Sequence, residues 1–158
     1  MKPADMLKYT TNMAAALEAA QKKAVFVGLP KDKVGDKVYG DGMTLIRNGA
    51  IHEYGVPKKG ISQRSFLRVP FNTKRRELNA AIAKQFQLMI TKGLDPDVAL
   101  GRVGVLATNV SKGAFTSLGY GTWTPIKQLT IDAKGSSQTL INTRMLGTSI
   151  TWVVRDAS

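Results

Sequence analysis

The chain has 158 residues, which is the usual size of one domain. Its 23 Lys and Arg residues outnumber 11 Asp and Glu, so the net charge of +12 favours an acidic partner such as nucleic acid, an anionic surface or an acidic protein. The absence of cysteine excludes disulfides, thiolate catalysis and Cys-based zinc sites, and the single histidine, His52, excludes multi-histidine metal sites.

No apolar run approaches the roughly 18 residues that a membrane-spanning helix needs. Residues 13–20 (MAAALEAA) resemble a signal-peptide core, but Glu18 interrupts them, so we expect a helix and not a secretion signal. We therefore expect the protein to work in the cytoplasm in which it is made.

The first part of the chain predicts a helix and then a strand. Residues 4–22 are expected to be helical, with Asp5 as the N-cap. Three larger apolar side chains share one face of this helix: Met6, Met13 and Leu17. Because alanine fills much of the remainder, this helix can pack against another copy of the chain as easily as against its own core. Residues 24–29 (AVFVGL) are typical of a strand.

Two loops flank a second, shorter helix. Residues 30–42 alternate charged and turn-forming residues, which predicts a long loop or a loose hairpin. Residues 43–54 predict a helix that ends at Gly55. Residues 56–70 lie between two prolines and predict an extended basic segment.

The second half predicts a helical hairpin. Residues 72–92 carry apolar side chains at i, i+4, i+8, i+11 and i+12, with Asn72 as the expected cap. A second helix is expected over 96–115, after a very short turn that makes the pair antiparallel.

The chain ends in a loop, a helical turn and a strand. An irregular loop is expected over 119–139, a helical turn within 139–147 capped by Asn142 or Thr143, and a strand over 149–154. The predicted fold is a single α+β domain over residues 1–158, in which a small mixed or antiparallel sheet packs against the helical hairpin.

The sequence offers no convincing catalytic or metal-binding constellation. His52 and Glu53 are adjacent, but a metalloprotease helix needs a second histidine four residues on, where Val56 stands. The aspartates of the 30–42 loop do not have the spacing of a calcium loop. Gly119-Tyr120-Gly121 lacks the third glycine of a dinucleotide fingerprint. We therefore expect no enzyme activity, no cofactor and no metal.

One stretch of the sequence is strongly basic. Between residues 56 and 76 it contains seven cations and no anion: Lys58, Lys59, Arg64, Arg68, Lys74, Arg75 and Arg76. A solvated basic loop is the plain interpretation, and a docking surface for an anionic partner is the functional one. Phe66 and Phe71 interleave with the cations, which would also suit stacking on single-stranded nucleic acid.

Residues 46–55 (IRNGAIHEYG) are followed closely by residues 61–67 (ISQRSFL). These segments resemble the A-x-x-H/N-E-[FY]-G and I-P-x-R-x-F-[LI] patterns of tailed-phage virion morphogenesis and tail-completion proteins. Further matches follow at Trp123-Thr124-Pro125, at 134–136 (KGS) and at 140–150, so the likeness spans roughly residues 43–155. Ser62, Asn142 and Arg144 stand where the family usually has proline, aspartate and glycine.

The resemblance implies a structural virion protein. Such proteins form rings at the neck or tail end, where they complete the tail and join it to the head. The expected assembly is a ring of six copies, or of twelve on the head side, in contact with neck or adaptor and tail-tube proteins, and with DNA passing through the channel as a lesser possibility. The expected location is the virion neck or tail, and the host cytoplasm during assembly.

The resemblance also assigns structural roles to individual residues. It implies that Glu53, Tyr54 and Gly55 end a helix and turn the chain, and that Arg64, Phe66 and Leu67 pin the basic segment. The other matching positions are Trp123, Pro125, Thr143, Leu146 and Ser149. Two alternatives remain open: a basic nucleic-acid-binding module and, with less support, an accessory subunit of an enzyme.

Overall fold

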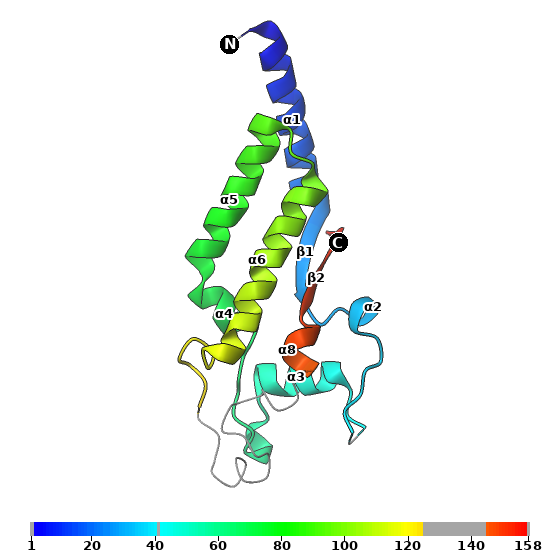
Figure 1. The fold of residues 1–158 in the computed structure, drawn as a ribbon, viewed down its shortest axis with the longest axis vertical. Coiled ribbons are helices and arrows are strands. Elements are labelled where there is room, and N and C mark those ends of the chain that lie inside the picture. Colours follow the sequence, from blue (N-terminus) through cyan, green and yellow to red (C-terminus); the bar gives the residue numbers. More distant parts are fainter. Residues whose placement is uncertain (1, 41, 125–144, 158) are drawn as a thin grey trace.

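A computed structural model of the chain describes residues 2–40, 42–124 and 145–157. Figure 1 shows its elements in chain order, and together they are mostly helical with a two-stranded antiparallel sheet packed against helices, so the predicted α+β class is confirmed. The elements are α1 (Pro3–Lys22), β1 (Lys23–Gly28), α2 (Lys31–Val34), α3 (Leu45–Tyr54), the 3₁₀ turn η1 (Pro57–Lys59), α4 (Arg68–Thr73), α5 (Arg75–Lys92), α6 (Pro96–Thr116), α8 (Met145–Ser149) and β2 (Thr151–Asp156).

The sheet joins the start of the chain to its last described residues. β1 and β2 pair antiparallel, with Val27 opposite Trp152. Trp152 lies against two glycines of α6, where a Cβ built at Gly104 would come within 2.6 Å of the indole ring and one at Gly101 within 3.0 Å. These small residues let the helix and the strand approach closely. The strand predicted at 149–154 begins later, because Met145–Ser149 form α8.

Helices α5 and α6 form the predicted antiparallel hairpin (Figure 1). α5 ends at Gly93, whose φ of 64° lies in the left-handed region that glycine adopts without steric cost. The carboxylate of Asp95 then caps α6 by accepting the N–H groups of Asp97 at 2.9 Å and Val98 at 3.1 Å. Pro96 occupies the first helical position, where a missing N–H costs nothing.

The segment before the hairpin is more helical than predicted. A single helix over 72–92 with Asn72 as its cap is wrong, because the chain bends at Lys74 (φ −98°, ψ 16°) and divides into α4 and α5. Pro70 is the third residue of α4, where an N–H would have no partner within the helix, so the proline does not break it.

The predicted loops are also partly ordered into short elements. Instead of one extended segment over 56–70, the chain forms η1, an isolated bridge between Val56 and Ile61, and the start of α4. The 30–42 region contains α2 and leads to a bridge between Val38 and Thr44.

Two helix N-termini differ from the sequence prediction. α1 is preceded by Lys2 and not by an Asp5 cap, although Asp5 stands in the first turn, where its charge suits the helix dipole. α3 begins after Thr44, whose hydroxyl accepts the N–H of Arg47 at 3.2 Å. The predicted helix end at Gly55 is confirmed, with φ at 72°.

Some predictions fall outside the described residues. The 119–139 loop is described only up to Thr124, as a series of turns that follow α6. The helical turn is described from Met145 onward as α8, whereas the proposed caps Asn142 and Thr143, and Pro125, lie outside.

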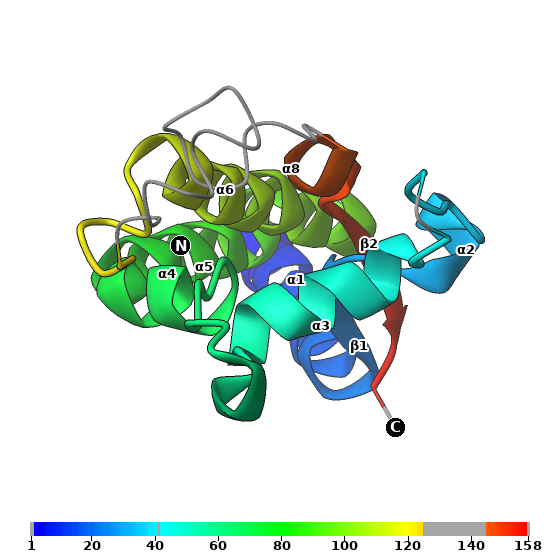
Figure 2. The ribbon, with the colours of Figure 1, turned by 90° about the horizontal axis from the view of Figure 1, so that it is seen from below.

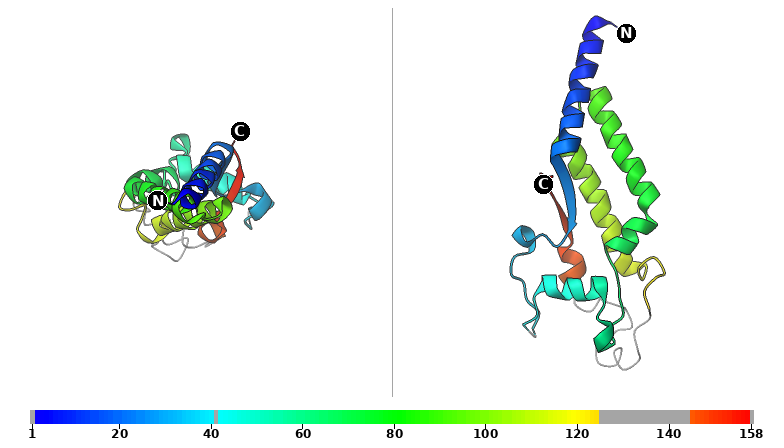
Figure 3. Two further views of the ribbon diagram at one scale, coloured as in Figure 1. Left: turned by 90° about the horizontal axis from the view of Figure 1, so that it is seen from above. Right: turned by 180° about the vertical axis from the view of Figure 1, so that it is seen from behind.

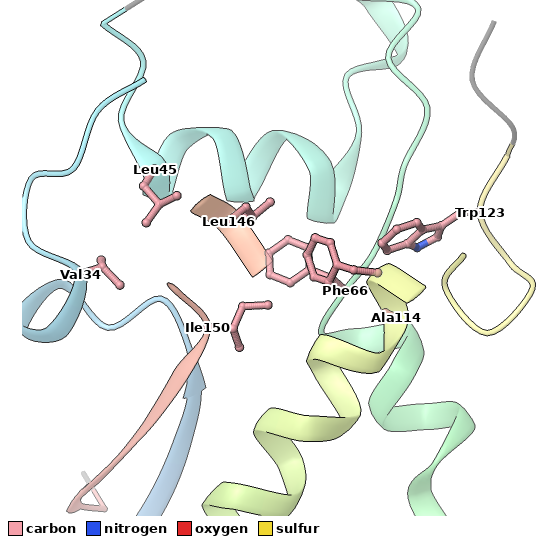
Figure 4. Packing of buried hydrophobic residues seen from close by; sticks show 8 residues of the cluster. Val34, Leu45, Phe66, Ala114, Trp123, Leu146 and Ile150 are labelled. Atoms are coloured by element: carbon pink, nitrogen blue, oxygen red, sulfur yellow. The ribbon is translucent and has the colours of Figure 1, made fainter. Parts of the chain in front are cut away.

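Buried apolar residues form two separate clusters. The larger one lies at the lower end of the molecule, where α3 crosses beneath the sheet and α6 (Figures 1 and 2). Its buried members are Val34, Leu45, Phe66, Ala114, Phe115, Trp123, Leu146 and Ile150 (Figure 4). The smaller one joins α1, α5 and α6 through Ala16, Ala19, Met89 and Ala99.

Candidate docking site around Glu53 and the basic segment

Glu53 holds the start of the basic segment against the end of α3. Its side chain is only 5% exposed. One carboxylate oxygen, Oε2, accepts the N–H groups of Phe66 at 2.9 Å and Leu67 at 3.0 Å. The other, Oε1, accepts the N–H and Nε–H of Arg68, both at 3.1 Å, and the hydroxyl of Ser65 at 2.7 Å. A buried carboxylate needs such a set of donors, and here it caps α4 from a distant part of the chain.

The turn after α3 brings the two motif segments together. A Cβ at Gly55 would lie 2.8 Å from the backbone nitrogen of Gln63, so only glycine fits between α3 and the returning chain. The N–H of Arg64 donates to the carbonyl of His52 at 2.8 Å, and the amide of Gln63 donates to the carbonyl of Glu53 at 3.0 Å. The residues at the end of α3 thus turn the chain, and Glu53 also binds the next motif.

Phe66 and Trp123 fix this segment to the larger cluster. Phe66 is 1% exposed and stacks at a tilt on Phe115, with 5.6 Å between ring centroids. The indole N–H of Trp123 donates to the carbonyl of Ser65 at 2.9 Å, and the hydroxyl of Ser111 in α6 donates to the carbonyl of Phe66 at 2.7 Å. Figure 4 shows Phe66 in the middle of this cluster, which also contains the fully buried Leu146.

The other matching positions take different places. Leu67 is partly buried and packs against the same cluster. Ser149 ends α8. Tyr54 points outward, 63% exposed, with the guanidinium carbon of Arg68 4.6 Å from its ring centroid. Pro125 and Thr143 lie outside the described residues.

The seven predicted cations do not form one continuous surface. Lys58 and Lys59 are exposed on η1. Arg68 binds Glu53, and Lys74 pairs with Glu77 at 3.2 Å and lies over the ring of Tyr120. Two further exposed cations, Arg75 and Arg76, begin α5. Within the described part of the chain, four of the seven are exposed and make no ion pair, so they can meet an anionic partner: Lys58, Lys59, Arg75 and Arg76.

Arg64 serves the fold more than the surface. It is only partly exposed, and burial lowers the pKa of its guanidinium, although an arginine remains charged at neutral pH. Its Nη2 lies 3.5 Å from the carbonyl of Thr124, and its buried Nε has no hydrogen-bond partner among the described residues. Arg64 is therefore a poor choice for a docking cation.

The carboxylate role of Glu53 was not foreseen from the sequence. A signal for it exists, because an anion in the last turn of a helix is disfavoured by the helix dipole and so calls for a compensating partner. Ser65 and Arg68, both in the following motif, supply part of that compensation.

Comparison of the chain with protein-family models, with curated proteins and with solved structures finds no match. Across residues 2–40, 42–124 and 145–157, no cluster of His, Cys, Asp and Glu could hold a metal ion. No helix in this described part is long and apolar enough to cross a membrane.

Proposed function

We propose that the chain is a structural virion protein of a tailed bacteriophage that forms a ring at the neck or tail end and joins head to tail. The observation that carries the proposal is the mutual contact of the motif residues. Glu53 binds the backbone of Phe66 and Leu67, Trp123 binds the carbonyl of Ser65, and Leu146 belongs to the same cluster as Phe66. Segments that resemble the family at scattered positions thus make one packed unit, which supports a common structural origin over a chance likeness.

The role of this unit would be to present a rigid, basic end to a neighbouring ring. Lys58 and Lys59 project from η1, directly after the turn that Gly55 and Glu53 hold in place. In the proposed assembly these cations meet acidic side chains of the adjacent neck or tail protein. Charge of this kind speeds the encounter and fixes the register, while apolar contacts supply most of the affinity.

The nucleic-acid alternative rests on the positive charge and on base stacking by Phe66 and Phe71, and the second of these supports is lost. Stacking on bases requires exposed aromatic rings. Phe66 is buried in the larger cluster, and Phe71 is partly buried on α4. What remains for that alternative is the charge of the exposed cations.

The test is a charge reversal in the phage that encodes the chain. Lys58→Glu combined with Lys59→Glu should yield intact heads and intact tails that fail to join. Electron microscopy of the lysate would detect the separate heads and tails. The matched control is Lys31→Glu combined with Lys33→Glu, an equal charge change on the exposed residues of α2. A single Lys58→Ala should be tolerated, because an exposed ion pair contributes about 0–1 kcal/mol.

Infectious particles in normal yield from the Lys58 and Lys59 reversal would contradict the docking role. A virion that contains a single copy of the chain would contradict the ring. Equal joining defects in both double reversals would point to net charge and not to this site.

A further inference from the structure

An apolar groove runs along one side of the upper half of the molecule. It has a volume of about 440 Å³ and lies between α1 and β1 on one side and α5 on the other, with α6 as its floor. In the rear view of Figure 3, these elements stand on either side of α6. The residues that line it include Ala16, Ala19, Val25, Ile82, Phe86 and Val103. Lys23 is the one charged residue of this lining, and it is paired with Asp97 at 2.5 Å.

The groove is open to solvent in a single copy of the chain. Ile82, on the α5 wall, is 49% exposed. On the opposite wall, α1 contributes only alanines, which are too small to fill the space. An apolar surface of this kind usually marks an interaction site.

The first half of α1 has the complementary feature. It extends beyond the end of α5, where no other described element covers it (Figures 1 and 3). One stripe of this helix carries four apolar or aromatic side chains, each more than one third exposed: Met6, Tyr9, Met13 and Leu17. Their spacing of i, i+3, i+7 and i+11 is that of a helix face that packs into a groove.

This stripe cannot reach the groove of its own chain. Ala16 and Ala19 of the same continuous helix form a wall of that groove. Met6 and Tyr9 therefore lie beyond the groove along the helix axis, whereas Met13 and Leu17 stay exposed beside it and are not part of its lining. The groove that the stripe can enter belongs to a second copy.

Charge also favours this occupant. The chain as a whole carries +12, so most of its surface repels another copy. Between residues 3 and 17 the charged residues are Asp5 and Lys8, which cancel. The exposed half of α1 is therefore a neutral segment that a second copy can bring to an apolar groove without like-charge repulsion.

We propose that the stripe Met6–Tyr9–Met13–Leu17 of one copy docks into the α1–α5–α6 groove of the next. Donor and acceptor surfaces differ, so each copy offers a helix to one neighbour and a groove to the other, and such a contact closes a ring when the rotation between copies allows it. The inference rests on the ring assembly proposed above and names the contact between copies that holds the ring together. The basic segment is not part of this contact.

A crosslinking experiment tests the contact directly, because the natural chain has no cysteine. One sample carries Met13→Cys and the other Ile82→Cys, and the two are mixed at high concentration with a short bismaleimide. The matched control replaces Met13→Cys by Ala15→Cys, an exposed position on the opposite side of the same helix. Covalent dimers should form with Met13→Cys and far less with Ala15→Cys.

A second pair of variants measures the contribution of the groove. Ile82→Glu should weaken self-association at least about ten-fold in sedimentation experiments. Val105→Glu, at an equally exposed position of α6 outside the groove lining, should leave it unchanged. Circular dichroism shows whether both variants keep their helices.

Equal crosslinking from Met13→Cys and Ala15→Cys, or no crosslinking at all, would overturn the contact. So would equal effects of Ile82→Glu and Val105→Glu in folded protein. Virions that hold a ring of this chain without the 13–82 crosslink would reject the contact and keep the proposed function. Specific 13–82 crosslinks in the isolated protein, together with normal head–tail joining in phage that lack this chain, would keep the contact and reject the proposed function.

Discussion

The two ends of the molecule differ in how completely their apolar side chains are buried and their buried polar groups are hydrogen-bonded within one copy of the chain. At the lower end, Phe66, Trp123 and Leu146 are buried together, and the carboxylate of Glu53 is surrounded by donors. At the upper end, alanines and Met89 make a thin cluster beside an open apolar groove, and residues 3–11 of α1 are all exposed. The lower end is built to be rigid alone, whereas the upper end leaves apolar surface that a second copy can cover.

The largest expected effect comes from replacing one phenylalanine at each end by alanine and comparing the two losses of stability. Phe66→Ala should lower the free energy of unfolding by about 3–5 kcal/mol, because its ring is fully buried. Phe86→Ala should cost less, about 1–3 kcal/mol, since Phe86 is only partly buried and lines the groove. Urea unfolding of the two variants at low concentration, where copies are separate, measures both values. Equal losses would mean that the upper cluster is as complete as the lower one.

The contribution of hydrogen bonds to the buried carboxylate at the lower end is tested at Glu53. Glu53→Gln keeps the shape but turns an amide NH₂ toward backbone N–H donors, so we expect a loss of about 2–3 kcal/mol. Glu77→Gln is the matched control, because among the described residues Glu77 makes an exposed pair with Lys74, and its loss should cost about 0–1 kcal/mol. Thermal unfolding of both variants gives the difference. A Glu53→Gln variant as stable as Glu77→Gln would show that the carboxylate does not hold the motif.

The smallest expected effect lies between the two ends, at the glycines of α6. Gly104→Ala places a methyl group against the Trp152 ring and should cost about 1–3 kcal/mol through overpacking. Gly113→Ala meets only the hydroxyl end of the Tyr120 side chain and not a ring face, so its cost should be smaller and limited to displacing the hydrogen bond from Tyr120 to the carbonyl of Val110. Urea unfolding followed by circular dichroism measures the cost of both substitutions. If the alanine at 104 proved as harmless as the one at 113, the close strand–helix contact would be doubtful.

Local sequence patterns predicted those helices and strands that are determined by residues close to one another in the sequence. The α5–α6 hairpin follows from the apolar repeat, from Gly93 and from the Asp95-Pro96 pair, and all three act within a few residues. Both strands were also found within one or two residues of their predicted starts. In each case the signal and the structure involve the same short stretch of chain.

The predictions that failed depend on distant contacts. The chain before α5 was expected to be extended because of its prolines, but Glu53 supplies the N-terminal donors of α4 with an acceptor and so stabilises a helix there. The partial burial of Arg64 also depends on distant contacts, because the sequence shows its charge and not its burial. The groove involves α1, β1, α5 and α6 at once, and no short pattern encodes it.

The antiparallel pairing of β1 with β2 has a consequence for the order of folding. β1 follows α1 near the start of the chain, yet its partner is made only after nearly every other described element. During synthesis the α5–α6 hairpin can form from contacts close in sequence, while β1 waits with both edges unpaired. A ribosome-bound chain that stops short of β2 should therefore contain the hairpin but leave the first strand exposed to chaperones, and closure of the sheet should be a late step of folding.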